Sequence, residues 1–451
     1  MSDPIVAAIR RLSCSVISDQ GAMEAYRRDL CVLGEAGAPR AVVRPTSVEQ
    51  VVATVDVCRE NTIPLVVRGT GTGLAGGANA VDGCVVLALD AMDRILEIDA
   101  LGRFARVQPG VVNADLDRAA AEHGLWYAPD PGSRDICSIG GNLATDAGGM
   151  CCAKYGVTRD HVLGLTAVLG TGEVVRTGGL TRKNVTGLHL THLLVGSEGT
   201  LGVIVEATLR LRPRPRAVST VAATFPTIQA ATDLVLALTR EFDAAAVELM
   251  DRTTVKAVNA MTHMGLDEAA GAVMLARFDG LDSAAQAERC AELATAQGAE
   301  AFSTSDEAEG RALMEARRVA LPALERGGAT LLDDVCVGVH QLPAMLAAIE
   351  EIADRHQVTI GTFGHAADGN LHPTVVFDPA SEAQRRAAWA AFEEILGAAL
   401  ELGGSITGEH GVGALKQQFV EAQVGPEAQS LMRRVKAAFD PAGILNPGRA
   451  Y

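Results

Sequence analysis

The sequence predicts an α+β protein with at least two domains. Its 451 residues exceed the roughly 250–300 residues at which a single hydrophobic core stops growing. Segments with helical periodicity alternate with short runs rich in valine and leucine, as expected for helices that cover sheets. Pro213-Arg214-Pro215 follows a predicted strand, and because proline cannot continue a sheet ladder we place the domain boundary near residue 213.

The charge and the cysteine content exclude several classes of function. Acidic residues outnumber basic ones by 55 to 39, and the net charge of −16 repels nucleic-acid phosphates, so we expect no nucleic acid as a partner. The nine cysteines are an odd number without CxxC spacing, which favours a reducing compartment, and we predict a cytoplasmic protein. No stretch reaches the roughly 18 apolar residues that span a membrane, so no transmembrane segment is predicted and any membrane contact would be peripheral.

Helices and strands are predicted to alternate in the first half of the chain. Ser47 begins a capping-box pattern, and valines at helical spacing then predict a helix to about Asn61. A second helix is predicted from Asn113, as its N-cap, to His123. The valine- and leucine-rich segments that predict strands are 64–67, 84–89, 105–107, 163–169, 173–177 and 203–211.

Two glycine-dense segments interrupt this alternation. Arg68–Ala78 contains five glycines, which allow positive φ and let backbone amides face a ligand such as a pyrophosphate. A Rossmann turn is the rival interpretation, but its helix should begin at the last glycine, where Gly76-Gly77 would break one. A purely structural cluster of turns also stays open. Residues 138–149 form the second segment, whose small side chains can lie flat against an extended planar ligand.

The second half is predicted to form an antiparallel sheet covered by helices. Helical periodicity marks residues 228–239, 284–297 and 342–356, and strand patterns mark 272–278 and 359–363. Arg317 and Arg318 fall within a further predicted helix. Paired arginines usually lie on a solvated helix face, and that reading stays open beside a functional one.

Three histidines and two acids gather in short segments bounded by glycine. His365 and His372 are separated by six residues, and a strand, a glycine turn and a second strand can point both rings inward. Imidazoles bind zinc, manganese or iron, Glu409 can add a carboxylate oxygen, and His410 is then a candidate base. The alternative is that these histidines only satisfy hydrogen bonds in tight turns. On these residues alone, a metal-dependent hydrolase fits as well as a redox enzyme.

The motifs, taken in order, resemble a known flavoprotein superfamily. The two glycine-dense segments and Gly196-Ser197-Glu198-Gly199 resemble the flavin-binding domain of the vanillyl-alcohol oxidase and para-cresol methylhydroxylase superfamily. The histidine segments resemble its D-2-hydroxyacid dehydrogenase branch, which includes D-lactate, glycolate and D-2-hydroxyglutarate dehydrogenases. The resemblance covers roughly residues 40–449. It implies a two-subdomain FAD-binding domain at 1–213, an α+β substrate-cap domain with an antiparallel sheet and a metal site at 214–425, and a C-terminal segment at 426–451 that packs back on the flavin domain.

The resemblance implies FAD as the cofactor. The loop Arg68–Ala80 contains no histidine, cysteine or tyrosine for covalent attachment, so we expect dissociable FAD. The residues it implies around the pyrophosphate are Arg68, Gly69, Thr70, Gly71, Thr72, Gly73, Gly76 and Gly77. The residues implied around the isoalloxazine and ribityl chain are Pro131, Gly132, Ser133, Gly140, Gly141, Asn142, Thr145 and Tyr155. Gly199 and Ile204 are implied on the adenine side. Asn446 would reach the flavin from the C-terminal segment. As a plain alternative for Asn446, Asn-Pro steps are ordinary turn formers.

Oxidation of a D-2-hydroxy acid needs a base, an electrophile and a group that binds the carboxylate. His410 is assigned as the base, and a divalent metal, zinc or alternatively manganese or iron, is assigned to His365, His372 and Glu409. The family places an arginine near Arg317 to bind the substrate carboxylate, although this chain has Arg-Arg where others have Arg-Glu.

Three neighbouring residues complete this assignment. Asn370 would hold the flavin or the substrate, and Asp368 would orient a ligand histidine. Family members commonly have glycine in place of Ala367, and a methyl group there can tilt the loop.

Leu332 and Asp333 offer no cation for a second carboxylate, which favours D-lactate or glycolate over D-2-hydroxyglutarate. The alternatives from other classes are a metal-dependent hydrolase and a non-catalytic flavin-binding subunit of a larger complex. The electron acceptor is a quinone, a cytochrome, an electron-transfer flavoprotein or oxygen, and we expect a homo-oligomer.

Overall fold

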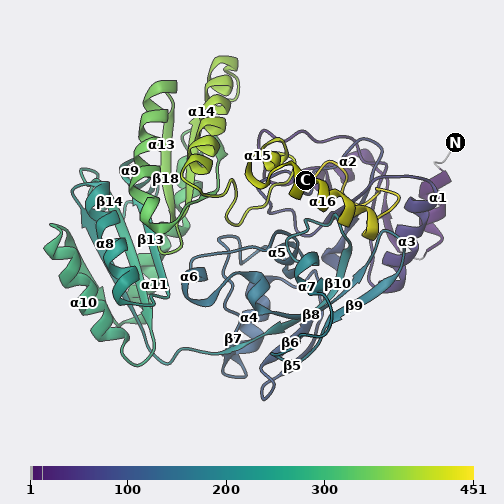
Figure 1. Cartoon of the computed structure of the whole chain (residues 1–451), viewed down its shortest axis with the longest axis horizontal. Coiled ribbons are helices and arrows are strands. Elements are labelled where there is room, and N and C mark those ends of the chain that lie inside the picture. The colour runs from purple at the N-terminus through teal and green to yellow at the C-terminus, as the bar shows by residue number, and fades with distance from the viewer. Residues whose placement is uncertain (1–3, 13) are drawn as a thin grey trace. The chain divides into compact units, whose positions relative to one another are not determined.

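The computed structural model describes residues 4–12 and 14–451, which form two compact units (Figure 1). Unit 1 comprises the chain up to Gly148, Gly156–Arg214 and Glu409–Tyr451, and unit 2 comprises Gly149–Tyr155 and Pro215–Gly408. The chain therefore leaves unit 1 and returns to it. The expected mixture of helices and antiparallel strands is confirmed. No helix among the described residues is long and apolar enough to cross a membrane.

The first sheet of unit 1 follows the order β1 (Ser15–Ile17), β2 (Ala41–Arg44), β4 (Val85–Ala88), β3 (Leu65–Arg68), with β2, β4 and β3 parallel. Helix α3 (Val48–Glu60) connects β2 to β3, and the predicted cap is confirmed, since the Ser47 hydroxyl accepts the Gln50 N–H at 3.4 Å. Val51 and Val55 on this helix are fully buried against the sheet. No helix begins after β3, where residues 69–84 run as turns and bends, as predicted against a Rossmann turn.

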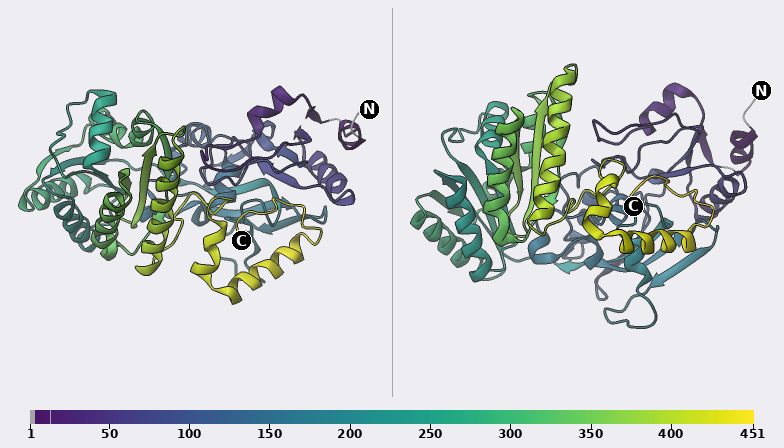
Figure 2. Two further views of the ribbon diagram at one scale, coloured as in Figure 1. Left: turned by 90° about the horizontal axis from the view of Figure 1, so that it is seen from above. Right: turned by 45° about the horizontal axis from the view of Figure 1, so that its top comes forward.

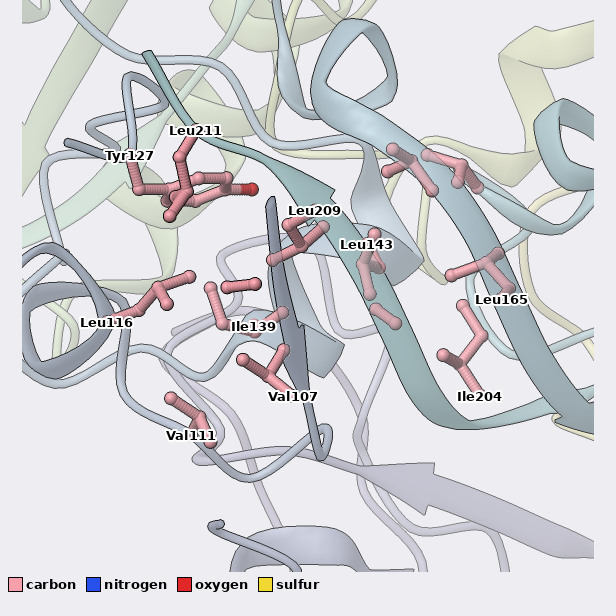
Figure 3. Packing of buried hydrophobic residues seen from close by; sticks show 14 of the residues in the cluster. Val107, Val111, Leu116, Tyr127, Ile139, Leu143, Leu165, Ile204, Leu209 and Leu211 are labelled. Atoms are coloured by element: carbon pink, nitrogen blue, oxygen red, sulfur yellow. The ribbon is translucent and has the colours of Figure 1, made fainter. Parts of the chain in front are cut away.

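The second sheet of unit 1 follows the order β5 (Ile95–Asp99), β6 (Phe104–Val107), β10 (Val203–Arg210), β8 (Val162–Val168), β9 (Val174–Gly178), with every neighbouring pair antiparallel. Helices α4 (Asn113–Ala121), α5 (Ile139–Thr145) and α7 (Leu190–Leu194) contribute buried residues to its core. Figure 3 shows Leu116, Ile139 and Leu143 from the helices packed with Val107 and Leu209 from the sheet.

Two local predictions in unit 1 were wrong. The N-cap of α4 is Val112, and Asn113 is the first helical residue, because its amide side chain instead donates to Pro129 O and Asn142 Oδ1, both at 3.2 Å. Pro213 does continue a short ladder: β11 (Arg212–Pro213) pairs with β7 (Leu125–Trp126), a two-residue pair in which proline is tolerated.

The C-terminal segment completes unit 1. Leu65 of β3 donates its N–H to Ile444 O and accepts the Asn446 N–H, both at 2.8 Å, so the end of the chain lies beside β3 as an additional extended segment. Before this extended segment, helices α15 (Val420–Val424) and α16 (Pro426–Phe439) follow each other in sequence and contact each other. The expected return to the flavin domain began at 426, whereas the contacts with unit 1 begin at Glu409. The remaining elements of unit 1 are α1 (Pro4–Arg10), α2 (Gln20–Met23) and short 3-10 turns.

Unit 2 is built on one antiparallel sheet. Its order is β15 (Glu300–Thr304), β12 (Val218–Phe225), β14 (Ala272–Asp279), β13 (Ala246–Asp251), β18 (Thr359–His365), β19 (Asn370–Phe377), β16 (Ala329–Leu332), and β17 (Val335–Cys336) also pairs with β19. Helices α8 (Ile228–Glu241), α10 (Ser283–Ala296), α13 (Leu342–His356) and α14 (Glu382–Glu401) lie side by side, while α9 (Arg252–Thr262), α11 (Glu307–Arg318) and α12 (Ala320–Glu325) form a second contacting group. Figure 2 shows these helices packed along the sheet. The short α6 (Cys152–Tyr155) also belongs to this unit.

The β18–β19 hairpin is closed by the turn Ala366–Gly369. Gly369 has φ +80°, and a Cβ there would overlap the carbonyl oxygen of Val337. Ala367 is not among the positive-φ residues of the described chain, so its backbone conformation does not require glycine. The turn thus accommodates the methyl group of Ala367.

Replacing Gly369 by alanine should therefore destabilise the protein by about 2–4 kcal/mol, because positive φ and a steric overlap both oppose a Cβ. Gly403→Ala is the matched control, since Gly403 also has positive φ (+72°) but no atom lies within 4 Å of its Cβ position. Urea unfolding measures both. Equal losses for the two variants would contradict the overlap at Val337.

Candidate active site

The hairpin places His365 and His372 on one face of the sheet of unit 2. Side chains of cross-strand partners share a face, and the register pairs His372 with Phe363, two residues before His365. Both imidazoles are buried, their ring centroids lie 5.2 Å apart at 85°, and each offers a ring nitrogen within 4.8 Å of the other's. The predicted strand, turn and strand that point both rings the same way are confirmed.

Glu248 lies directly opposite His365. Strand β13 pairs with β18 so that these two residues are partners, and the Glu248 oxygens lie 2.8 and 3.0 Å from His365 Nδ1. A carboxylate at this distance accepts the Nδ1–H, which assigns the tautomer and presents Nε2 as the atom that can bind a metal. Sequence analysis did not single out Glu248, because its proximity depends on pairing between strands 117 residues apart.

Asp334 faces His372 at a longer distance than the one between Glu248 and His365. Its Oδ1 lies 3.6 Å from His372 Nδ1 and accepts the Asn370 amide at 2.8 Å. Its Oδ2 accepts the Thr407 hydroxyl at 2.7 Å and the Gly408 N–H at 2.9 Å. Asp334 is fully buried, and acids are almost never so unless they are paired. The tandem acids within the apolar run Leu331–Val337 were the sequence pattern that could have revealed it.

Arg317 reaches this face from helix α11. Its Nε lies 2.7 Å from Glu248 Oε2 and its guanidinium lies 4.5 Å from the centroid of the Phe363 ring. Arg317 is only 7% exposed, so the solvated-face interpretation is wrong for it, whereas the Arg318 side chain is 41% exposed. Glu248 therefore stands between a guanidinium and an imidazole. The two terminal amino groups of Arg317 are the donors that can bind a carboxylate.

Two further predicted residues of unit 2 make contacts within it. Asn370 donates its side-chain amide to Asp334 and to Val335 O at 3.1 Å, so it positions Asp334; its predicted contact with flavin or substrate stays a prediction. Asp368 accepts the Asn370 N–H at 3.4 Å, while the carboxylates that face the two imidazoles are Glu248 and Asp334.

Glu409 and His410 begin the last segment of unit 1, directly after Gly408, the last residue of unit 2. His410 Nε2 lies 3.6 Å from Glu409 Oε1. The Gly408 N–H donates to Asp334. Glu409 is the next residue in the chain, and its Cα lies about 3.8 Å from the Cα of Gly408. Their roles as metal ligand and base stay predictions.

The two glycine-dense segments contact each other in unit 1. A Cβ on Gly69 would lie 2.5 Å from Ser138 Oγ, so glycine is needed for this approach. Arg68 is buried beside Gly71 (φ +80°), and within the described residues its Nη1 has no hydrogen-bond partner. Burial lowers the pKa of the Arg68 guanidinium, and the nearby Asp29 carboxylate opposes that shift. A buried, partly unsatisfied guanidinium beside a glycine loop fits a phosphate group.

Within the second glycine segment, residues 139–145 form helix α5, and the contact of this segment with a planar ligand stays a prediction. Ser138 caps α5 by accepting the Gly141 N–H at 3.3 Å, and a Cβ on Gly140 would lie 2.6 Å from Pro109 Cβ. Thr145, at the end of this helix, donates its hydroxyl to Gly141 O.

The other residues implied around the flavin lie in different places. Tyr155 belongs to unit 2, where its hydroxyl donates to Asp279 at 2.6 Å. Gly199 has φ +72°, Ile204 lies in the core of the second sheet, and Asn446 donates to Gly77 O and Glu198 O at 3.0 and 2.7 Å.

Two family models and several known proteins match this chain. The model of the FAD binding domain matches residues 39–178, and that of the FAD linked oxidases' C-terminal domain matches residues 214–450. The glycolate oxidase subunit GlcD of Bacillus subtilis is 41% identical over 418 residues (92% of this chain and 89% of that one). The D-lactate dehydrogenase of Archaeoglobus fulgidus is 37% identical over 421 residues (91% and 92%).

Solved structures share the fold at lower identity. p-Cresol methylhydroxylase with substrate bound superposes with a TM-score of 0.81 at 20% identity, covering 99% of this chain and 96% of that one. The 4-ethylphenol oxidase from Gulosibacter chungangensis has the same TM-score at 21% identity, with the same coverage. The predicted superfamily fold is thereby confirmed.

Replacing Glu248 by glutamine should lower the free energy of unfolding by about 3 kcal/mol, because it leaves the Arg317 charge buried without a counter-ion. Glu315→Gln is the matched control: Glu315 also pairs with an arginine of α11, Arg318, but is half exposed, so its loss should stay within about 0.5 kcal/mol. Chemical denaturation measures both. A Glu248→Gln variant as stable as the control would contradict the charge pairing.

Proposed function

The chain belongs to the family of FAD-linked oxidases, and we propose that it oxidises a D-2-hydroxy acid, D-lactate or glycolate, to the 2-oxo acid. Relatives over nine-tenths of the chain are named glycolate oxidase subunit and D-lactate dehydrogenase. One observation supports the proposal most. On one face of unit 2, the carboxylates of Glu248 and Asp334 face the imidazoles of His365 and His372, and the buried Arg317 pairs with Glu248. A hydrolytic enzyme would need no flavin domain, and D-2-hydroxyglutarate remains the alternative substrate.

FAD fits the residues of unit 1. The glycine loop beside Arg68 would take the pyrophosphate, and the helix α5 that follows Ser138 would lie beside the flavin. When bound, FAD supplies the hydride acceptor for the substrate α-carbon. Since 68–80 contains no histidine, cysteine or tyrosine, we propose that FAD is held without a covalent bond.

A divalent metal, zinc or alternatively manganese or iron, fits His365, His372 and Glu409. Two imidazoles whose Nδ1 atoms face carboxylates, together with one further carboxylate, are a donor set typical of such ions. Bound there, the metal would supply a Lewis acid for the substrate hydroxyl.

The protein's own groups would handle the proton and the carboxylate. His410 would accept the hydroxyl proton, since the unperturbed pKa of imidazole, about 6.5, suits a base near neutral pH. Arg317 would bind the substrate carboxylate through its terminal amino groups, and Glu248 would hold the guanidinium in place through Nε. The electron acceptor would be a quinone, a cytochrome, an electron-transfer flavoprotein or oxygen. The protein would act as a homo-oligomer in the cytoplasm. Any membrane contact would be peripheral.

His410→Ala should lower kcat for D-lactate or glycolate by about 10²- to 10⁴-fold while FAD stays bound, because a general base is lost. Flavin absorbance and dye-linked oxidation are measured together, with L-lactate and D-2-hydroxyglutarate in the panel. His340→Ala, at an exposed histidine of unit 2, is the control and should keep wild-type rates. An unchanged rate in His410→Ala would favour a different base, and no oxidation of any hydroxy acid by wild type would favour the non-catalytic subunit.

Removal of the metal should lower the rate without releasing the flavin. We expect dialysis against a chelator to reduce kcat by at least about tenfold, and zinc, manganese or iron to restore it. Elemental analysis gives a second readout: His372→Ala should lose the bound metal, whereas His356→Ala, whose ring pairs with Glu394, should keep it. Full activity in metal-free protein would overturn the role of the metal, and metal retained in His372→Ala would overturn this ligand assignment.

A further inference from the structure

Glu198 is a buried carboxylate to which sequence analysis gave no role. It lies between Gly196 and Gly199 in the third flavin-like motif and has positive φ (+51°), a conformation that non-glycine residues rarely adopt. Burial raises the pKa of the Glu198 carboxyl, and hydrogen bonds from backbone N–H groups oppose this shift. A strained, buried acid needs partners that repay its desolvation.

Its two oxygens bind one turn of the chain. Glu198 Oε1 accepts the Val412 N–H at 2.8 Å and Oε2 accepts the Gly413 N–H at 2.7 Å. A Cβ on Gly411 would lie 3.1 Å from the Glu198 carboxyl carbon, and Gly411 has φ +85°. The turn can therefore approach the carboxylate closely only with glycine at 411.

The same turn is held by the first glycine loop. Ala414 and Leu415 both donate their N–H groups to Ala75 O, at 2.9 and 3.1 Å. On its other side, the backbone oxygen of Glu198 accepts the Asn446 amide. Residues 411–415 are thus fixed within unit 1 by segments that the resemblance assigns to flavin binding.

The residues just before this turn are Glu409 and His410. Upstream of them, Asp334 of unit 2 binds Thr407 and Gly408, and downstream Glu198 of unit 1 binds Val412 and Gly413. Each of these two carboxylates is buried and accepts two hydrogen bonds from residues next to the segment 409–411. In chain order, the segment 409–411 therefore follows two residues that are hydrogen-bonded within unit 2 and precedes two that are hydrogen-bonded within unit 1.

We propose that Glu198 is a positioning residue for His410: by fixing the backbone two and three residues downstream, it determines the position of the imidazole. The proposal rests on the proposed function, in which His410 is the base. A displacement of about 1 Å in a reacting group can cost about 100-fold in rate, so backbone anchors of this kind affect turnover without touching the substrate.

The test uses Glu198→Gln in the FAD-loaded enzyme. A glutamine oxygen accepts one of the two N–H groups, and its amide opposes the other. We expect kcat to fall roughly 10- to 100-fold, with FAD content unchanged and KM altered by less than about threefold. In a His410→Ala background the same substitution should change the rate by less than about twofold, because the residue acts through His410.

Asp440→Asn is the matched control. Asp440 is also a buried carboxylate of unit 1, but among the described residues its side chain bonds Lys436 Nζ at 2.5 Å and the Leu445 N–H at 2.7 Å, outside the 411–415 turn. It should lower the thermal midpoint about as much as Glu198→Gln and leave kcat within about twofold of wild type. Hydrogen exchange at the amides of 412 and 413 should accelerate in Glu198→Gln and not in the control.

Three results would overturn the proposal: wild-type kcat in flavin-loaded Glu198→Gln, an equal loss in the His410→Ala background, or loss of FAD as the main effect. If wild type oxidises no 2-hydroxy acid, the proposed function fails instead. Exchange at residues 412 and 413 then still decides whether Glu198 fixes the turn.

Discussion

The organisation of unit 2 depends on one constraint, the compensation of a buried carboxylate. Glu248 is removed from water in the middle strand of the sheet, where an ionised acid is costly unless it is paired and hydrogen-bonded. Arg317 supplies the charge and His365 the second donor, so helix α11 and the β18–β19 hairpin are tied to the same side chain. A charged group held on both sides in this way gives the imidazole a defined tautomer and orientation. The position of His365 and Arg317 thus follows from the hydrogen bond and the ion pair that the buried Glu248 carboxylate requires.

In unit 1 the corresponding constraint is close backbone approach. Gly69 against Ser138 and Gly140 against Pro109 leave too little space for a Cβ, and Gly411 lies close to Glu198 with a positive φ of +85°. The glycines that suggested a flavin site therefore also pack loop on loop, so the ligand-binding and the structural interpretations of these segments do not exclude each other. Arg68 favours the ligand-binding interpretation, because packing alone does not require a buried guanidinium with an unsatisfied nitrogen.

The comparisons contribute at two levels. Solved structures at about 20% identity share the fold with this chain, and folds of this kind host different reactions. Relatives at 37–41% identity over nine-tenths of the chain narrow the chemistry to hydroxy acids. Glu248, His365, His372 and Arg317 lie on one face of unit 2, and they are the groups on which our proposal for metal and substrate binding rests.

The sequence by itself determined the local structure: the helix that Ser47 caps, helix α13 at its predicted bounds, and the hairpin that turns His365 and His372 to one face. It also determined the family, because the motifs occur in order along the chain. Only the tertiary structure decided which carboxylates stand behind the imidazoles, that Arg317 is buried, that Asn113 does not cap its helix, and that Glu198 binds the turn after His410. The physical reason is distance along the chain: caps and periodicity act within a few residues, whereas Glu248 and His365 meet through strand register across 117 residues, which no local pattern encodes.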